Sequence, residues 1–359
     1  MSDTRPFAPK PFAVVTGGSS GIGLELARQF ADNGYDVLLS AEDATELQQA
    51  RAQITGGGAT VTTHASDLAT EEGVDSLLGA IGGRDVDAIA INAGVGLGGR
   101  FAETELQREL KMIDLNVRGA VQLAKPIVQR MVARGQGRIL FTSSIAGTMP
   151  GTFEAVYAGT KAFDRWFAQA LREELKGTGV TVTALMPGTT ETNFFRRADM
   201  MDTAAGTQSK DDAALVAKAG FDAMMAGKDH VIPTSKNKVM AFIAESLPDP
   251  IAAKMHRGLT EPGSADKKSN AAPLAVGAAA LGVGAALFAY WRNGRNEAEP
   301  YAEGAGAQDA ARPAVGQPAS GTTTAPDPTG GPASGTGAQP GATPLPADVP
   351  TATEIRVGA

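Results

Sequence analysis

The 359-residue sequence contains no cysteine, and this absence excludes several classes of protein. Without thiols the chain has no disulfide framework, no zinc finger, no cysteine-ligated iron–sulfur cluster and no cysteine nucleophile. Histidine is also scarce, since only His64, His230 and His256 are present and they are far apart. Such spacing is not a metal-ligand pattern, so each is expected to be an ordinary surface or packing residue, and no metal site is predicted.

An excess of positive charge is lacking as well. The formal net charge is −7 at pH 7, and seven acidic residues against two basic ones beyond Asn296 account for most of it. The preceding part is nearly neutral and has no basic stripe, which argues against nucleic acid as the main partner. The first residues, MSDTRPFAPKPF, lack the apolar run of a secretory signal, so we expect a cytoplasmic location.

Residues 11–260 alternate short, almost continuously apolar runs with helical stretches, after an N-terminal arm at 1–10. This alternation predicts an α/β fold of Rossmann type, a doubly wound parallel sheet with helices on both faces. The expected strands are 12–16, 36–40, 60–64, 86–91, 138–142 and 180–186. The expected helices are 21–33, 43–54, 70–81, 105–134 and 154–176.

A linker at 261–270 leads to residues 271–291, which contain no charged side chain. The length suits one membrane helix, and Tyr290 and Trp291 resemble an interfacial anchor. Ala and Gly dominate the segment, so a flexible linker or a soluble helix explains it equally well. We therefore expect either of these or association with the inner face of a membrane.

The remaining residues, 292–359, predict a disordered tail. Ten of the 21 prolines lie there together with Gly, Ala, Thr and Ser, and Tyr301 is the only aromatic residue. Such a composition buries too little apolar surface to offset the loss of chain entropy.

A glycine-rich turn, Thr16-Gly-Gly-Ser-Ser-Gly-Ile-Gly23, follows the first expected strand and opens the first helix. Glycines permit a tight turn and close approach to a pyrophosphate, and the helix N-terminus supplies free N–H groups. The spacing is TGxxxGIG rather than GxGxxG.

This turn and several further motifs in the same order resemble the classical short-chain dehydrogenase/reductase family. The further motifs are Asp67-Leu68, Asn92-Ala93-Gly94, Asn116 in Leu-Asn-Val, Ser143-Ser144, Tyr157-Ala-Gly-Thr-Lys161, and Pro187-Gly188 with Thr192. The resemblance covers about residues 10–260. Ile91 departs from it, because the family usually has a second Asn there, and residues 260–359 have no counterpart.

Tyr157 and Lys161 lie four residues apart and therefore share one helix face. At about 4 Å a neighbouring ammonium favours the phenolate by roughly 3 pKa units before desolvation, which would make Tyr157 a usable acid–base group. Ser144 precedes Tyr157 by the family's thirteen residues, which makes Ser143 the structural member of the pair. The resemblance implies that Ser144 holds the substrate oxygen and that Lys161 binds the nicotinamide ribose. It also implies that Asn116 kinks its helix and holds a water that relays protons.

By the same resemblance a nicotinamide cofactor contacts residues at the ends of five strands and on the helix of Tyr157. The expected contacts are Gly17, Ser19, Ser20, Gly21, Ile22, Gly23, Glu42, Asp67, Leu68, Asn92, Ala93, Gly94, Tyr157, Lys161, Pro187, Gly188 and Thr192.

Glu42 lies 19 residues after Gly23, at the position where dinucleotide-binding folds place the residue that binds the adenosine ribose. The run Ser40-Ala-Glu-Asp43 has no cation beside it, so we favour NAD over NADP. Ala41 limits this preference, because NAD-specific relatives usually carry Asp at that position. Alternatively, Glu42 and Asp43 only cap the following helix.

The predicted activity is reversible hydride transfer between a nicotinamide and a carbonyl or alcohol. The alternative is a cofactor-binding sensor or membrane-tethered scaffold that retains the fold. The resemblance implies a homodimer or homotetramer, and a substrate lid at 189–207. Phe194, Phe195, Met200 and Met201 of this lid suit an apolar substrate or pack the lid onto the core.

Overall fold

The structure is a computed structural model that describes residues 10–266. The predicted membrane segment at 271–291 and the predicted tail at 292–359 lie outside the described residues, as do most of the N-terminal arm and part of the linker. Among the helices of residues 10–266, none has the length and apolar character needed to span a bilayer.

Seven parallel strands form one sheet, in the order β3-β2-β1-β4-β5-β6-β7. The register pairs Val14 of β1 with Leu38 on one side and Ile89 on the other. This order confirms the predicted Rossmann-type fold. Strands β2 and β3 are added on one side of β1, and β4 to β7 are added on its other side, so the strand order reverses between β1 and β4. The strands are β1 Phe12–Thr16, β2 Asp36–Ala41, β3 Val61–Ala65, β4 Ala88–Ile91, β5 Gly137–Thr142, β6 Val180–Leu185 and β7 His230–Val231.

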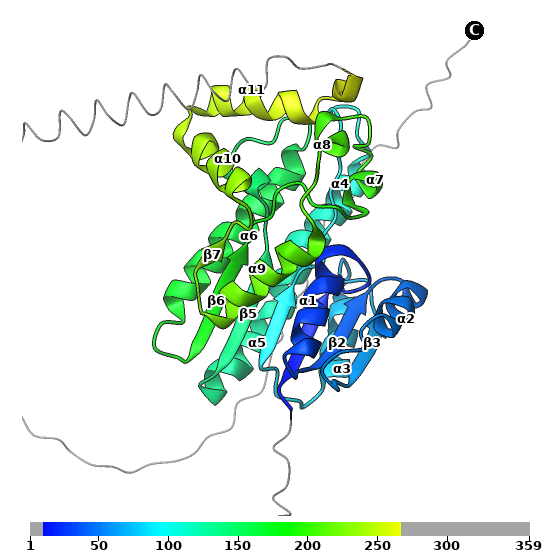
Figure 1. The fold of residues 1–359 in the computed structure, drawn as a ribbon, viewed down its shortest axis with the longest axis vertical. Helices are drawn as coiled ribbons and strands as arrows, with labels where there is room; N and C mark the ends of the chain where they lie inside the picture. Colours follow the sequence, from blue (N-terminus) through cyan, green and yellow to red (C-terminus); the bar gives the residue numbers. More distant parts are fainter. Residues whose placement is uncertain (1–9, 267–359) are drawn as a thin grey trace, which may run out of the picture. The chain divides into compact units, whose positions relative to one another are not determined.

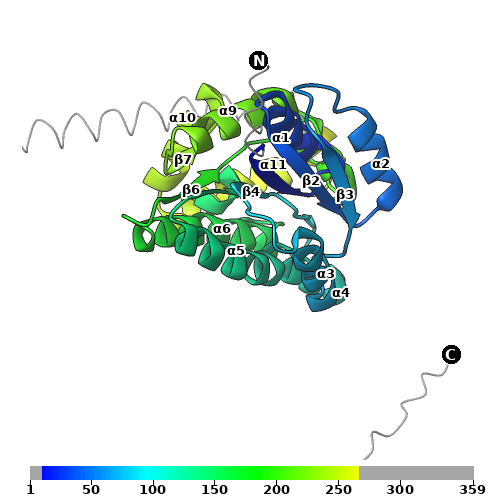
Figure 2. The same ribbon diagram turned by 90° about the horizontal axis from the view of Figure 1, so that it is seen from below.

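Helices cover both faces of the sheet (Figures 1 and 2). One apolar core contains Ala13 and Val15 of β1, and the other contains Val14, because successive strand residues point to opposite faces. The first face carries α1 Gly21–Asp32, α2 Ala44–Ala52 and α9 Ala213–Met225, and the second carries α3 Glu71–Ile81, α5 Ala120–Arg134 and α6 Ala155–Glu174.

The helix expected at 105–134 is interrupted in its middle. It consists of α4 Leu106–Ile113, the π-helical turn η1 Asp114–Gly119, and α5. Asn116 lies within the π-helical turn, where one extra residue per turn shifts the helix face. The sequence alone predicted a single helix there.

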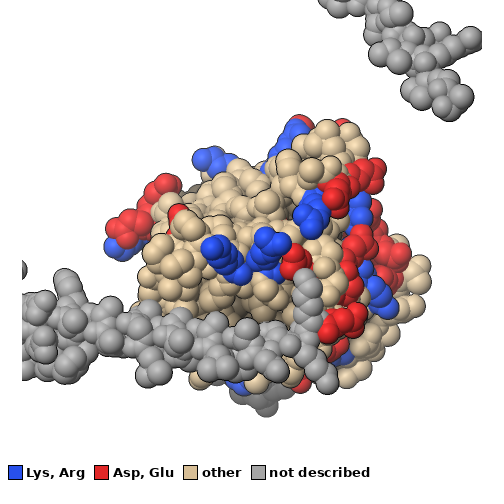
Figure 3. All heavy atoms as spheres, turned by 90° about the horizontal axis from the view of Figure 1, so that it is seen from above, with Lys and Arg blue, Asp and Glu red and all other residues tan. Residues whose placement is uncertain are grey.

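Short helices follow β6 and gather at one end of the molecule with α4 (Figure 1). Phe195 and Met200 are buried in a small core that Leu259 also contacts, so these two lid residues pack the lid rather than face outward. On the face seen in Figure 3, basic and acidic side chains lie side by side and much of the surface is uncharged. The elements after β6 are α7 Phe194–Arg197, α8 Ala204–Thr207, α10 Ser235–Ser246, α11 Asp249–Thr260 and η3 Ser264–Asp266, whereas the short helix η2 Ile145–Thr148 follows β5.

Candidate active site

The glycine turn between β1 and α1 has a shape that only glycine permits at two positions. Gly17 has φ +64°, and a Cβ there would lie 2.9 Å from the Cα of Ala93. A Cβ on Gly23 would lie 2.1 Å from the carbonyl oxygen of Gly17. Ser20 precedes α1 without capping it through its side chain, and the first turn of α1 has no acidic residue. These features fit the pyrophosphate of a dinucleotide, which would accept hydrogen bonds from the start of α1.

Asn92 ties together the ends of three neighbouring strands. The hydroxyl of Thr16 accepts hydrogen bonds from the backbone N–H groups of Asn92 at 2.9 Å and Ala93 at 3.0 Å. The Asn92 side chain donates to the carbonyl of Thr16 at 3.1 Å and accepts from the hydroxyl of Thr142 at 3.0 Å. Asn92 therefore fixes β1, β4 and β5 relative to one another at the edge where the cofactor contacts were predicted.

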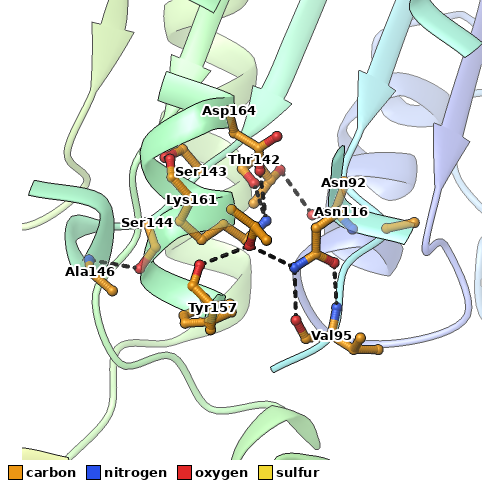
Figure 4. A network of polar contacts seen from close by, with 12 residues as sticks. Asn92, Val95, Asn116, Thr142, Ser143, Ser144, Ala146, Tyr157, Lys161 and Asp164 are labelled. Atoms are coloured by element: carbon orange, nitrogen blue, oxygen red, sulfur yellow. Dashed lines mark hydrogen bonds and ion pairs between the residues drawn. The ribbon is translucent and has the colours of Figure 1, made fainter. Parts of the chain in front are cut away.

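Asn116 connects the loop after β4 with α6 (Figure 4). Its Oδ1 accepts from the backbone N–H of Val95 at 2.9 Å, and its Nδ2 donates to the carbonyl of Val95 at 2.9 Å. The Nδ2 group also donates to the hydroxyl of Thr160 at 3.0 Å. The side-chain amide thus holds α6 against the loop that follows β4.

Ser143 and Ser144 have different surroundings at the end of β5. The hydroxyl of Ser143 donates to the backbone carbonyl of Lys161 at 2.6 Å and so anchors α6. Ser144 accepts from the N–H of Ala146 at 3.1 Å and donates to the carbonyl of Pro187 at 3.4 Å, and its side chain affects the phenol of Tyr157. Of the two hydroxyls, that of Ser144 therefore lies at the phenol of Tyr157.

Tyr157 is buried on α6, and its ring packs against Phe194 of the lid with a centroid distance of 5.2 Å. Burial is the main cause that raises the pKa of Tyr157 above its usual value, followed by the charge of Glu154. The hydrogen bond with Ser144 lowers this pKa, and the charge of Asp164 raises it. The pKa is therefore raised overall, whereas the sequence analysis expected the ammonium of Lys161 to lower it before desolvation and did not include the two carboxylates.

Lys161 forms a buried ion pair that the sequence analysis missed. Its Nζ donates to the carbonyl of Thr142 at 2.9 Å and to Oδ2 of Asp164 at 3.0 Å (Figure 4). Both charged side chains are only 6% exposed. The sequence could have indicated this pair, because Asp164 follows Lys161 by three residues and falls on the helix face of Tyr157 and Lys161.

Glu154 and His256 form a second buried pair that was missed, next to the start of α6. Their Oε2 and Nε2 atoms lie 3.7 Å apart, and Nδ1 of His256 contacts the carbonyl of Thr152 at 3.1 Å. Burial raises the pKa of Glu154 to about 8 and lowers the pKa of His256. Both side chains are therefore neutral at pH 7.

The buried Glu154 makes stability depend on pH. Because its pKa is raised on folding, its stabilising effect is present below the unfolded pKa near 4.5 and is lost as the pH rises through about 8. We expect the free energy of unfolding of the wild type to fall by on the order of 3 kcal/mol between pH 5 and pH 8.5, and we expect Glu154→Gln to abolish this decrease. Thermal unfolding over this range measures it. The exposed Glu173→Gln is the control, and equal pH dependence in wild type and Glu154→Gln would contradict the expectation.

Two cations reach the expected adenosine end of the site from distant parts of the chain. Nζ of Lys111 on α4 lies 3.2 Å from a carboxylate oxygen of Glu42 and 3.2 Å from one of Asp67. Arg197 of α7 binds Glu46 at 3.0 Å. The expectation that no cation lies near Glu42 is therefore wrong, because it considered only neighbours in the sequence.

The two acidic residues after β2, Glu42 and Asp43, have different roles. The carboxylate of Asp43 accepts a hydrogen bond from the backbone N–H of Glu46 at 2.8 Å and caps α2. Glu42 does not cap the helix but extends to Lys111. The capping alternative therefore holds for Asp43 alone.

The remaining predicted contacts surround this edge. A Cβ on Gly21 would lie 2.7 Å from Cγ2 of Thr192, so the lid starts directly beside the glycine turn. A Cβ on Gly94 would lie 3.2 Å from Nζ of Lys161. The backbone carbonyl of Pro187, next to Gly188, accepts from the N–H of Ile145 at 3.0 Å. Within residues 10–266, no cluster of His, Asp or Glu is arranged to hold a metal ion.

Comparison with known proteins gives matches over this same region. The sequence profile of the family described as short chain dehydrogenase matches residues 11–203. A probable NADP-dependent dehydrogenase of Haemophilus influenzae is 36% identical over 179 residues, which cover 49% of this chain and 70% of the relative.

Solved structures share the fold. A short-chain dehydrogenase from Sphingobium yanoikuyae in complex with NADPH has a TM-score of 0.59 and 24% identity, covering 66% of this chain and 96% of that one. A short chain dehydrogenase/reductase from Burkholderia phymatum in complex with NAD has a TM-score of 0.60 and 21% identity, covering 65% and 92%.

Proposed function

Because the chain belongs to the short chain dehydrogenase family, we propose that Tyr157 is the acid–base group of its hydride-transfer reaction. The protein is an oxidoreductase that acts on hydroxyl or carbonyl groups with NAD or NADP. The observation that carries the proposal is the buried position of Tyr157, whose phenol is affected by the Ser144 side chain, on the same helix face as the buried Lys161. This arrangement supports a substrate oxygen held by Ser144 and protonated by Tyr157.

When bound, the nicotinamide supplies or accepts the hydride. Among the chain's own residues, Ser144 orients the substrate oxygen, and Tyr157 donates its proton to that oxygen or takes one from it. Lys161 binds the nicotinamide ribose next to Gly94, where the lack of a side chain leaves room at its ammonium. The glycine turn binds the pyrophosphate, and Asn116 keeps α6 in place through Thr160.

The test of this function is a panel of ketones, aldehydes and quinones with NADH or NADPH, followed by the absorbance of the reduced nicotinamide. We expect consumption of reduced cofactor with at least one carbonyl class. The sensor or scaffold alternative requires cofactor binding without turnover on the whole panel. The relative described above is named as a dehydrogenase, and it gives that alternative no support.

We further propose that the protein prefers NAD(H). Lys111 is already paired with Glu42 and Asp67, so a 2′-phosphate would have to displace carboxylates to reach it. Glu46 holds Arg197 in the same way. The NADP-dependent relative shows that this preference is not a property of the whole family.

Replacing Glu42 with Arg should shift the preference towards NADP(H) by about tenfold or more. The change removes one of the two carboxylates paired with Lys111 and adds a second cation, and a charged hydrogen bond contributes about 1.5–3 kcal/mol. The ratio of NADH to NADPH dissociation constants measures the shift. Glu71→Arg is the control, because Glu71 of α3 also forms an exposed ion pair, with Arg118 of η1. A wild type that binds NADPH more tightly than NADH would contradict the proposal.

We also propose self-association through α4, α5 and α6, which lie on one side of the sheet (Figure 2). The apolar side chains of Leu110, Val121 and Trp166 are exposed on these helices, and Trp166 is 63% exposed. Exposed apolar groups of this size are typical of protein interfaces.

Trp166→Glu should lower the mass of the particle in solution at micromolar concentration, because a buried carboxylate destabilises an apolar interface. Light scattering measures the mass. Leu215→Glu, on the opposite face in α9, should leave it unchanged. A monomeric wild type would refute the proposed association.

A further inference from the structure

Two glycines in the loop after β4 lie against side chains of the lid. A Cβ on Gly96 would lie 2.4 Å from Cζ of Phe194, and a Cβ on Gly98 would lie 2.4 Å from Cγ of Met200. The N–H of Gly98 also donates a hydrogen bond to the carbonyl of Ala198 at 2.9 Å. A larger residue at either glycine would push the lid away, so this loop is shaped to receive the lid in the position that the structure shows.

In this position Phe194 covers the proposed acid–base group. Its ring lies 5.2 Å from that of Tyr157, and further apolar side chains from the loop after β4, α4, η2 and α6 complete a cluster around the two rings. These further members are Val95, Leu97, Met112, Ala146 and Val156. Tyr157 and Ser144 are each only 8% exposed. A substrate whose oxygen reaches both hydroxyls must therefore insert its neighbouring group beneath Phe194, into apolar surroundings.

Several cations on the elements that carry this cluster are held by carboxylates. These pairs are Arg108–Asp199, Lys111–Glu42, Lys161–Asp164 and Arg197–Glu46. Arg196 is exposed and follows Phe194 by two residues, so it points to a different side of α7. A substrate carboxylate beneath Phe194 would have to displace a protein carboxylate or remain unpaired, and burying an unpaired charge is costly.

We propose that Phe194 determines substrate specificity and that the substrate is an uncharged ketone, or the corresponding secondary alcohol, with a flat apolar group beside the reacting carbon. An aryl or a cyclic hydrocarbon group has this shape and packs between the Phe194 ring and the rest of the cluster. The substrate oxygen is then held at Ser144 and Tyr157. This inference rests on the proposed function and adds the substrate class to it.

The test compares kcat/KM for acetophenone with the values for 3-acetylbenzoate and 4-acetylbenzoate, which differ from it only by a carboxylate. The wild type should favour acetophenone by at least about tenfold. Phe194→Arg places a cation beside the substrate ring and should move this ratio towards the acetylbenzoates by at least about tenfold. A general loss of structure would lower all three values together and leave the ratio unchanged.

Two further variants test the contact itself. Phe194→Ala should raise KM for acetophenone by about tenfold, because the ring no longer covers the substrate. Gly96→Ala should raise this KM as well, because the added Cβ displaces the Phe194 ring. Phe242→Ala is the control, since Phe242 is exposed on α10 and does not belong to the cluster, and its KM should stay at the wild-type value.

A wild type that uses the acetylbenzoates as well as acetophenone overturns the inference, and so does an unchanged ratio in Phe194→Arg. If the variants do not fold, the comparison in the wild type decides alone. Turnover confined to charged or short-chain carbonyls refutes the substrate class and leaves the proposed function standing. Undiminished turnover in Tyr157→Phe, or no turnover on the whole panel, refutes the proposed function instead.

Discussion

Tyr157→Phe is expected to lower turnover by at least about 100-fold, with cofactor affinity nearly unchanged. The substitution removes the transferable proton and leaves the ring in its contact with Phe194. Steady-state kinetics on any substrate found in the panel, together with cofactor titration by fluorescence, separates the two effects. A parallel loss of binding would indicate that the phenol also holds the cofactor.

The matched control is Tyr35→Phe. Tyr35 is half-buried and packs against Phe30, far from the active site, and its hydroxyl donates to the sulfur of Met225 at 3.7 Å. This variant should keep wild-type turnover. Wild-type turnover in Tyr157→Phe would show that the proton comes from another group.

Gly23→Ala should weaken cofactor binding by at least about tenfold. The added Cβ would lie 2.1 Å from the carbonyl oxygen of Gly17 and 2.6 Å from Nδ2 of Asn92, so the turn must shift. Overpacking of this kind also costs about 1–3 kcal/mol of stability. Calorimetric titration with NADH and NADPH measures the affinity, and thermal unfolding measures the stability.

Gly79→Ala is the corresponding control on a helix. A Cβ at Gly79 of α3 meets no atom within 4 Å. Alanine there should leave cofactor affinity unchanged and raise stability by up to about 1 kcal/mol, because alanine has the higher helix propensity. Unaltered cofactor binding in Gly23→Ala would mean that the glycine turn does not bind the pyrophosphate.

Features encoded in a short stretch of sequence were predictable. The glycine turn depends on contacts between Gly17, Gly23 and the adjoining strand ends, and its position between a strand and a helix already indicated it. The parallel sheet follows from the repeated alternation of strands and helices, because parallel neighbours need crossover connections, although the expected strands did not include β7. The π-helical turn at Asn116 was predicted as a kink only through the family resemblance.

Features that depend on tertiary packing were not predictable in this way. Lys111 meets Glu42 across 69 residues, and His256 meets Thr152 across 104 residues, so no local window contains either pair. Asp164 is different, because it lies three residues from Lys161 and was overlooked although its position on the helix face indicated burial. Burial is the main cause of the raised pKa of Tyr157, and Asp164 contributes less to it.

The contact between α11 and the start of α6 gives a segment outside the matched family profile an influence on the chemistry. The profile ends at residue 203, whereas His256 and Thr260 both hydrogen-bond the carbonyl of Thr152, and Nε2 of His256 lies 3.7 Å from the buried carboxylate of Glu154. Hydration of Glu154 would let it ionise at a lower pH and add a negative charge beside Tyr157. Insertions or truncations near residue 250 would therefore change the pKa of Tyr157, the proposed proton donor, from outside the segment that the family profile matches.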